Sequence, residues 1–99
     1  MLYVLYCRDK PDSLSLRTGN RPAHLEYASQ AGERLRLAGP MLDADGMPCG
    51  SLMIMEAASQ EAAELTVRHD PYFTAGLFEQ VDVYPFKPVL GTWADAGDS

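Results

Sequence analysis

The chain has 99 residues, 46% of them hydrophobic, and a formal net charge of −6. This length suits one domain and is too short for two separate hydrophobic cores. A core this small gains stability from association, so we expect a single domain that forms an oligomer. The acidic balance, with no local cluster of Lys and Arg to offset it, argues against binding to nucleic acid.

The first segment, residues 2–7, is rich in Leu, Val and Tyr and contains no Gly or Pro, which predicts a buried strand. It does not have the basic leader, apolar stretch and cleavage site of a signal peptide. No run in the chain approaches the roughly 18 apolar residues that a membrane span requires. We therefore expect a cytoplasmic protein with no membrane partner.

Residues 11–20 differ in pattern from the residues that follow Pro22. The first stretch is mostly polar and closes on Thr-Gly-Asn, which indicates a short helical turn or a loop. Pro22 suits the first turn of a helix, and apolar residues recur every three to four positions from Leu25 to Leu35. The spacing predicts a first main helix that begins at Pro22.

Two strands are predicted next. Residues 34–41 alternate polar and apolar side chains before a Gly-Pro break, as a half-buried strand does, and residues 42–50 are a loop. Residues 51–56 are almost continuously apolar, which predicts a strand that is buried on both faces. We expect helices on one of these faces and the sheet of a second subunit on the other.

A second helix and a last strand complete the pattern. Ser59 can cap the helix, which ends near His69 because a residue before proline is disfavoured in the α region. Residues 72–76 are a connector or turn. Residues 77–84 predict the last strand, which stops at Pro-Phe-Lys-Pro.

The order β-α-β-β-α-β predicts an α+β fold of the ferredoxin-like, split β-α-β type, with an antiparallel sheet covered on one face by two helices. The other face needs a cover, and a second copy of the chain supplies it in a homodimer. We place the domain at residues 1–92. Residues 93–99 form an acidic tail that we expect to be flexible, although Trp93 can dock on the body or the partner.

Several short motifs in a fixed order carry a resemblance to a known family. They are Met-Leu-Tyr-Val-Leu-Tyr at 1–6, Arg-Pro-Ala-His-Leu at 21–25, Ala-Gly-Pro-Met at 38–41, Gly-Ser at 50–51, Asp-Pro-Tyr at 70–72 and Tyr-Pro-Phe-Lys at 84–87. Together they resemble the YCII-related (YciI-like) family over about residues 1–90. The resemblance implies a dimeric α/β barrel and a site built on a histidine and an aspartate.

The family's histidine corresponds to His24 and its aspartate to Asp70, and both are present. From the residues alone, His24 lies in the first turn of the predicted helix and Asp70 just past the end of the other helix. Helix packing would not by itself bring them together, so the loop around Pro71 must do so. The alternative is that His24 is a surface residue and Asp70 a polar loop residue.

Four further residues are candidate substrate ligands. Ser51 can donate a hydrogen bond to a substrate oxyanion or simply satisfy a backbone carbonyl. Arg21 can bind a carboxylate through two hydrogen bonds or remain solvated. Tyr72 and Phe86 can line a pocket, although aromatic residues near strand ends more often belong to the core.

The two cysteines, Cys7 and Cys49, match no close-spaced ligand or redox pattern. With His24 and His69 they could supply four zinc ligands, but structural zinc sites draw their ligands from tight pairs such as C-x-x-C. Free thiols, with Cys7 packed as a small hydrophobic residue, fit better. No nucleotide-binding loop is present either, so we expect neither a metal nor a cofactor.

Two hypotheses of function follow. In the first, the chain is an enzyme that transfers a proton on a small organic molecule, with His24 as general acid/base and Asp70 fixing its tautomer. The resemblance implies lyase or isomerase chemistry, since the family includes members implicated in dehydrohalogenation of chlorinated muconolactone-type substrates. In the second, a non-catalytic dimeric domain binds a metabolite or an accessory partner. Cofactor-independent oxygenation, known for other dimeric α/β barrels, has no feature in its favour here.

Overall fold

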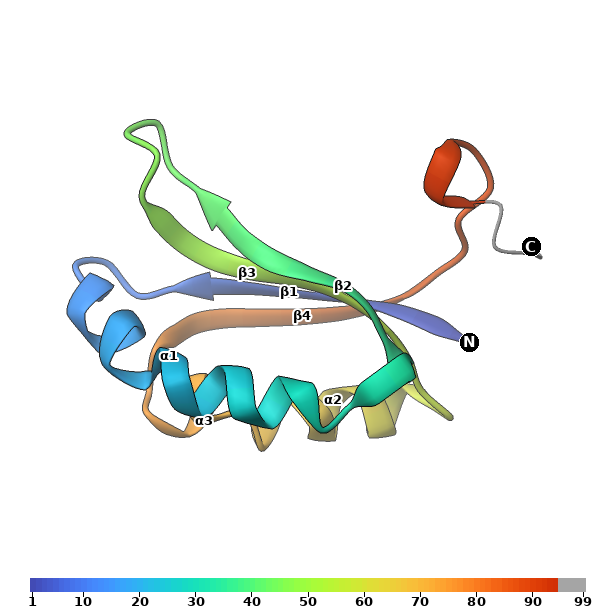
Figure 1. The fold of residues 1–99 in the computed structure, drawn as a ribbon, viewed down its shortest axis with the longest axis horizontal. Coiled ribbons are helices and arrows are strands. Elements are labelled where there is room, and N and C mark those ends of the chain that lie inside the picture. Colours follow the sequence, from blue (N-terminus) through green and yellow to red (C-terminus); the bar gives the residue numbers. More distant parts are fainter. Residues whose placement is uncertain (95–99) are drawn as a thin grey trace.

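The computed structural model describes residues 1–94, and these residues form one antiparallel sheet with helices against it (Figure 1). The elements are β1 (Leu2–Asp9), α1 (Leu14–Ser29), β2 (Leu35–Leu42), β3 (Pro48–Glu56), α2 (Gln60–Arg68), α3 (Pro71–Thr74) and β4 (Phe78–Phe86), with single 3₁₀ turns at Gly32–Arg34 and Thr92–Ala94.

The strand order across the sheet is β2-β3-β1-β4, and every neighbouring pair is antiparallel. Helices α1, α2 and α3 all lie on one face of this sheet, as Figure 1 shows. The first and third strands of the chain are therefore the two central ones, and β2 and β4 are the edges. This arrangement confirms the predicted α+β, ferredoxin-like fold.

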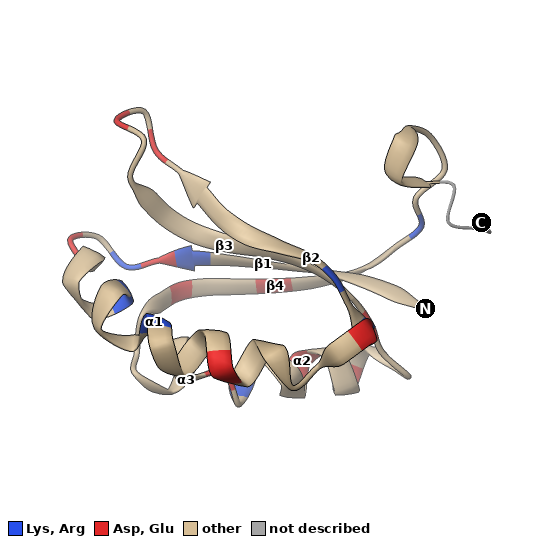
Figure 2. Ribbon diagram, in the orientation of Figure 1, with Lys and Arg blue, Asp and Glu red and all other residues tan. Residues whose placement is uncertain are grey.

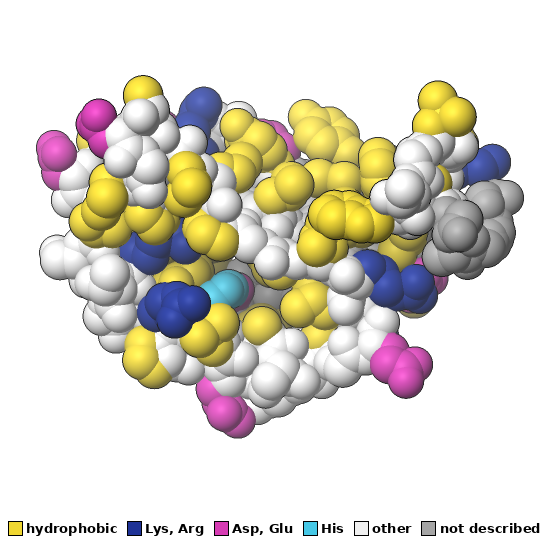
Figure 3. Space-filling view, turned by 45° about the horizontal axis from the view of Figure 1, so that its top comes forward, with side chains coloured by type: hydrophobic (Ala, Val, Ile, Leu, Met, Phe, Trp, Pro, Cys, Tyr) yellow, Lys and Arg dark blue, Asp and Glu magenta, His cyan; other side chains and the backbone are white. Residues whose placement is uncertain are grey.

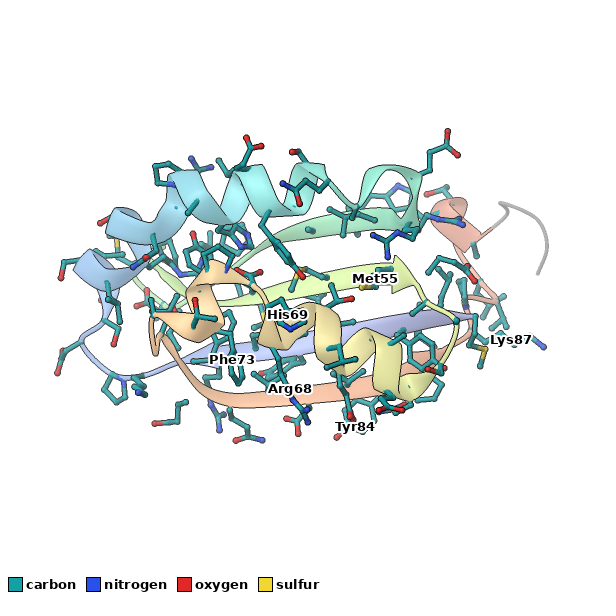
Figure 4. All side chains as sticks on the ribbon, turned by 90° about the horizontal axis from the view of Figure 1, so that it is seen from below. Met55, Arg68, His69, Phe73, Tyr84 and Lys87 are labelled. Atoms are coloured by element: carbon teal, nitrogen blue, oxygen red, sulfur yellow. The ribbon has the colours of Figure 1, made fainter. Side chains whose placement is uncertain are left out.

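The core lies between the helices and one face of the central strands. Every second residue of β1 and β3 points to this side, because successive side chains of a strand alternate between its faces. The buried members of this layer are Tyr3, Leu5, Cys7, Met53 and Met55, which pack with Ala63 and Val67 of α2. Figure 4, which views the helix side, shows Met55 on the sheet next to the helix layer. Ser59 caps α2 as predicted, because its hydroxyl accepts a hydrogen bond from the Ala62 amide.

The prediction for the first helix was wrong at its start. The helix α1 begins at Leu14, and Pro22 lies inside it. The predicted turn or loop over residues 11–20 is therefore mostly helix. Its periodicity is hidden in the sequence because the one residue of α1 that is buried, Arg17, is charged rather than apolar.

Three boundaries also differ from the prediction. The strand β4 continues through Pro85 to Phe86, which is possible because an edge strand needs ladder hydrogen bonds on one side only. The strand β3 begins at Pro48, inside the predicted loop. The predicted connector after Asp70 contains the four-residue helix α3, which is too short to leave a periodic pattern.

The face of the sheet away from the helices is largely apolar. Its side chains include Leu2, Val4, Tyr6, Leu52, Ile54, Tyr84 and Phe86, which the strand registers place together. Residues 51–56 were predicted to be buried on both faces of their strand. They are buried on the helix side, but Ile54 and Leu52 on the other side are only partly buried within the single chain. Figure 2 shows few charged positions along the strands and a group of acidic ones at the turn between β2 and β3. None of the helices described in residues 1–94 has the length and apolar character to span a membrane.

Candidate active site

A cavity of about 490 Å³ opens between α1 and the strands β2 and β3. Arg17, Arg21 and His24 line it from α1, Ser51 lines it from β3, and Tyr72 lines it from α3. Figure 3 shows this side of the molecule, where the surface is hollowed around a histidine side chain and Lys or Arg side chains lie next to it. Most of the predicted site residues thus meet in one place.

His24 and Asp70 are in direct contact. The Nδ1 atom of His24 lies 2.9 Å from both carboxylate oxygens of Asp70. The side chains are 12% and 3% exposed, respectively, so little water competes for this contact. His24 lies in the second half of α1 rather than in a first turn, and Asp70 is the N-cap of α3, where it also accepts a hydrogen bond from the Tyr72 amide. The short helix that begins at Pro71 is what carries the carboxylate to the imidazole.

Tyr72 fixes the plane of the histidine ring. The two rings are stacked, with centroids 4.0 Å apart and planes 11° apart, and Tyr72 is 1% exposed. Burial raises the pKa of the Tyr72 phenol above its ordinary value, although the nearby arginines oppose this, so the phenol stays neutral around pH 7. With Nδ1 of His24 held by Asp70, Nε2 is the ring nitrogen that remains for a ligand in the cavity.

Arg17 and Asp9 form a buried ion pair that the sequence analysis did not identify. Arg17 donates from Nε and Nη2 to the two Asp9 oxygens, at 2.7 and 3.0 Å, and from Nη2 to the Ser51 hydroxyl at 2.8 Å. Its guanidinium carbon lies 4.7 Å from the centroid of the Tyr72 ring. Burial alone would lower the pKa of Arg17, but the hydrogen bonds and charge of Asp9 outweigh it and raise the pKa, so the side chain carries a permanent positive charge.

The sequence spacing of Arg17 relative to Arg21 and His24 indicates that all three share one face of a helix. Arg17, Arg21 and His24 are four and three residues apart, which places them on one face of a helix. Arg17 joins this face only because α1 begins at Leu14, whereas the sequence predicts a helix that begins at Pro22.

Arg21 lies at the exposed rim of the cavity and makes no hydrogen bond or ion pair with the other described residues. Phe86 is not brought to this cavity. It pairs with Leu2 in the sheet and lines a different groove, between the apolar sheet face and residues 87–94. The reason is strand alternation, since Tyr3 faces the helices and its neighbour Leu2 therefore faces the other side.

The charged side chains in the cavity wall are all basic although the protein is acidic, and Asp9 and Glu56, which pair with Arg17 and Arg36, lie outside the lining. Three of the eight Lys and Arg residues, Arg17, Arg21 and Arg36, line it, and no Asp or Glu belongs to its lining. Asp9 and Asp70 lie behind Arg17 and His24 rather than in the wall. An anionic group in the cavity therefore meets positive charge first.

The candidate metal ligands do not converge. Within residues 1–94 no three His, Cys, Asp or Glu side chains are placed to hold one metal ion, and Cys7 and Cys49 are not joined by a disulfide. Burial, with the carboxylates of Asp70 and Asp9 adding to it, raises the pKa of the Cys7 thiol to about 12. His69, the second histidine, is exposed at the C-cap of α2, on the helix layer in Figure 4.

A comparison with known families matches residues 1–87 to the YCII-related domain. The chain belongs to this family. It is 44% identical over 98 residues to the protein YciI of Escherichia coli O6:H1, a match that spans 91% of this chain and all of the relative. It is 36% identical over 99 residues to an uncharacterized protein of Haemophilus influenzae, again across 91% of this chain and all of the relative.

Among solved structures, the chain is similar to 5-chloro-2-hydroxyhydroquinone dehydrochlorinase (TftG) from Burkholderia phenoliruptrix AC1100 in complex with 2,5-dihydroxybenzoquinone. The identity is 37%, the TM-score 0.83, and the match covers 88% of this chain and 94% of that one. An antibiotic biosynthesis monooxygenase shares the fold at 17% identity, with a TM-score of 0.54, over 91% of this chain and all of the other. The similarity to these two structures agrees with the predicted fold class.

Proposed function

We propose that this YCII-related protein is a cofactor-independent lyase or isomerase that transfers a proton on a small organic molecule. His24 is its general acid/base, and Asp70 orients the imidazole. The observation that carries the proposal is the position of Nδ1 of His24, 2.9 Å from both oxygens of a nearly fully buried carboxylate.

The chemistry follows from this contact. A carboxylate accepts a hydrogen bond from the Nδ1–H group of a neutral imidazole, which leaves the lone pair on Nε2 free to take a proton from the substrate. The same carboxylate then stabilises the imidazolium that forms. Stacking on Tyr72 holds the ring in one plane, so Nε2 is presented to the cavity in a fixed direction.

The similarity to a dehydrochlorinase supports an elimination. Acting on the keto tautomer of the ring, in which the two reacting carbons are tetrahedral, His24 would take a proton from one ring carbon, the electrons of that C–H bond would form a double bond, and a chloride ion would leave from the adjacent carbon. The substrate would be a flat, oxygen-bearing ring. Ser51 and Tyr72 would contact it in the wall of the cavity, and Arg21 would bind its anionic group at the rim.

We propose in addition that two copies of the chain pair through the apolar face of the sheet. Ile54 and Leu52 are incompletely buried in the single chain, and Tyr84 and Phe86 are 60% and 38% exposed on the same face. Phe86 would then belong to the dimer contact rather than to the cavity. Residues 1–92 would form the paired domain, and of the tail over 93–99, residues 95–99 lie outside the described residues.

The test is chloride release from 5-chloro-2-hydroxyhydroquinone by the wild type, His24→Ala and His69→Ala. Loss of a general acid/base lowers kcat by about a hundredfold or more, so His24→Ala should lose turnover. His69→Ala removes the other histidine, which is exposed and outside the cavity, and should match the wild type. Ring binding that is equal in all three proteins, with no turnover in any, would instead support a non-catalytic binding domain.

A further inference from the structure

We infer that Arg17 and Ser51 form an oxyanion site facing His24, so that the substrate is a ketone, or the keto tautomer of a phenol, whose oxygen becomes negative as His24 removes a proton from a neighbouring carbon. This inference rests on the proposed function and adds to it the class of substrate and the group that stabilises its charge. Arg17, Ser51 and His24 line one cavity of about 490 Å³.

The hydroxyl of Ser51 is available as a donor. Its oxygen accepts a hydrogen bond from Nη2 of Arg17 at 2.8 Å, and Ser51 is only 4% exposed. A hydroxyl has one proton, and acceptance of a bond leaves that proton free to donate elsewhere. No other described residue takes it, so the cavity is where it can be used.

Arg17 offers a second donor in the same place. Its Nε and Nη2 atoms donate to Asp9 and Ser51, and the Tyr72 side chain also interacts with the guanidinium, but no hydrogen bond of normal geometry joins Nη1 to a described residue. Among those residues, no buried side-chain nitrogen or oxygen atom is without a hydrogen-bond partner. The Nη1 atom is therefore open to solvent, and the solvent next to this buried side chain is that of the cavity it lines.

Both donors are fixed before a ligand arrives. Asp9 holds the guanidinium through two hydrogen bonds, and the face of Tyr72 lies 4.7 Å from its carbon atom. Donors that are already fixed in place stabilise a developing negative charge without reorganisation when the charge appears. Two hydrogen-bonded donors, one of them charged, match an oxygen with two free lone pairs.

The proton transfer then balances in charge and electrons. The substrate C–H bond breaks, its proton goes to Nε2 of His24, and the electron pair moves through a new carbon–carbon double bond onto the oxygen. Asp70 offsets the new imidazolium and Arg17 offsets the new oxyanion. Return of the proton to another carbon completes an isomerisation, and loss of a chloride from the adjacent carbon completes an elimination.

The experiment uses 4-nitrophenol, whose absorbance distinguishes the neutral phenol from the phenolate. With the wild-type protein we expect preferential binding of the phenolate, seen as a lower apparent pKa of bound 4-nitrophenol than of the free compound. Ser51→Ala should bind the phenolate about 10-fold to 100-fold more weakly, because a hydrogen bond to a charged group is lost. Ser29→Ala, which removes an exposed hydroxyl on α1, should match the wild type.

Two further variants keep the result interpretable. Arg17→Lys retains the positive charge but loses the planar set of guanidinium N–H donors, so it should also weaken phenolate binding. Circular dichroism should confirm that this variant is folded. His24→Ala should keep the phenolate preference although it loses turnover, which separates this inference from the proposed catalysis. Absence of phenolate binding by the wild type, or an equal preference in the wild type and Ser51→Ala, would overturn the oxyanion site and leave the general base untouched.

Discussion

At the scale of single residues, the site consists of a buried ion pair and a buried histidine–carboxylate pair on either side of one aromatic ring. Asp70 holds His24, Asp9 holds Arg17, and Tyr72 is stacked on the imidazole while its face lies against the guanidinium. Each carboxylate lies behind its partner, seen from the cavity. The two carboxylates thus fix the direction of the His24 imidazole and the Arg17 guanidinium. The Tyr72 ring, which contacts both, holds them in position relative to each other.

The Arg17–Asp9 pair gives a stability prediction. The two side chains are 7% and 6% exposed, so removal of one partner leaves an uncompensated buried charge. We expect Arg17→Met to lower the free energy of unfolding by about 3–5 kcal/mol. Urea denaturation of Arg17→Met, Asp9→Leu and the double variant measures this. The double variant should be more stable than Arg17→Met alone, and additive losses would show that the pair is not coupled.

Motifs in the sequence were enough to predict five of the site residues, which are His24, Asp70, Ser51, Tyr72 and Arg21. In the structure each of them lines the cavity or contacts a residue that lines it. Arg17 and Asp9 were harder to predict as site residues from the sequence. A charged residue on the buried face of a helix interrupts the apolar pattern by which helices are recognised. Phe86 was predicted as a site residue from its motif alone. Because side chains alternate along β4 and Phe86 pairs with Leu2, Phe86 lies on the face of the sheet away from the helices.

At the scale of elements, the strands and helices with apolar spacing were predictable. The structure agrees, except at the ends of the elements, with the strands predicted at residues 2–7 and 51–56 and with the helix predicted after Ser59. The four-residue helix α3 has no period to detect, yet its cap Asp70 and its first residue Pro71 are typical of a helix start. The element that carries the carboxylate was therefore signalled by its capping residues and not by periodicity.

Gly50 sets how closely β1 and β3 approach each other beside the site. A Cβ atom built there would collide with the carbonyl oxygen of Cys7 and meet the end of the Met41 side chain. Because the first obstacle is backbone, Gly50→Ala should lower the free energy of unfolding by about 1–3 kcal/mol in urea titrations. Gly39→Ala, in the neighbouring strand, meets nothing within 4 Å and is the matched control. Equal stability of the two variants would mean that the strands separate at little cost.

At the scale of the whole molecule, the elements formed by residues 1–94 leave much of one face of the sheet without a cover. Helices bury the side of Met53 and Met55, whereas Ile54 between them faces the opposite side. Sequence alone could indicate that residues 52–55 are apolar throughout, but the second cover has to come from outside the described residues. The proposed dimer supplies that cover as a second sheet.

The proposed dimer predicts a mass of twice 10.9 kDa in sedimentation equilibrium at micromolar concentration. Ile54→Asp would bury an unpaired charge in the contact and should give a folded monomer or an insoluble protein. Leu65→Asp introduces the same charge at an exposed position of α2, on the helix side, and should remain a dimer. A wild-type mass of 10.9 kDa under these conditions would contradict the pairing.

The most direct test of the central claim, that Asp70 orients His24 for proton transfer, is the turnover of Asp70→Asn on 5-chloro-2-hydroxyhydroquinone. Asn caps a helix as well as Asp does, so α3 and the melting temperature should be preserved. The neutral amide can neither fix the reactive tautomer nor stabilise the imidazolium, so kcat should fall by about a hundredfold or more. Chloride release at the wild-type rate by a folded Asp70→Asn protein would contradict the account.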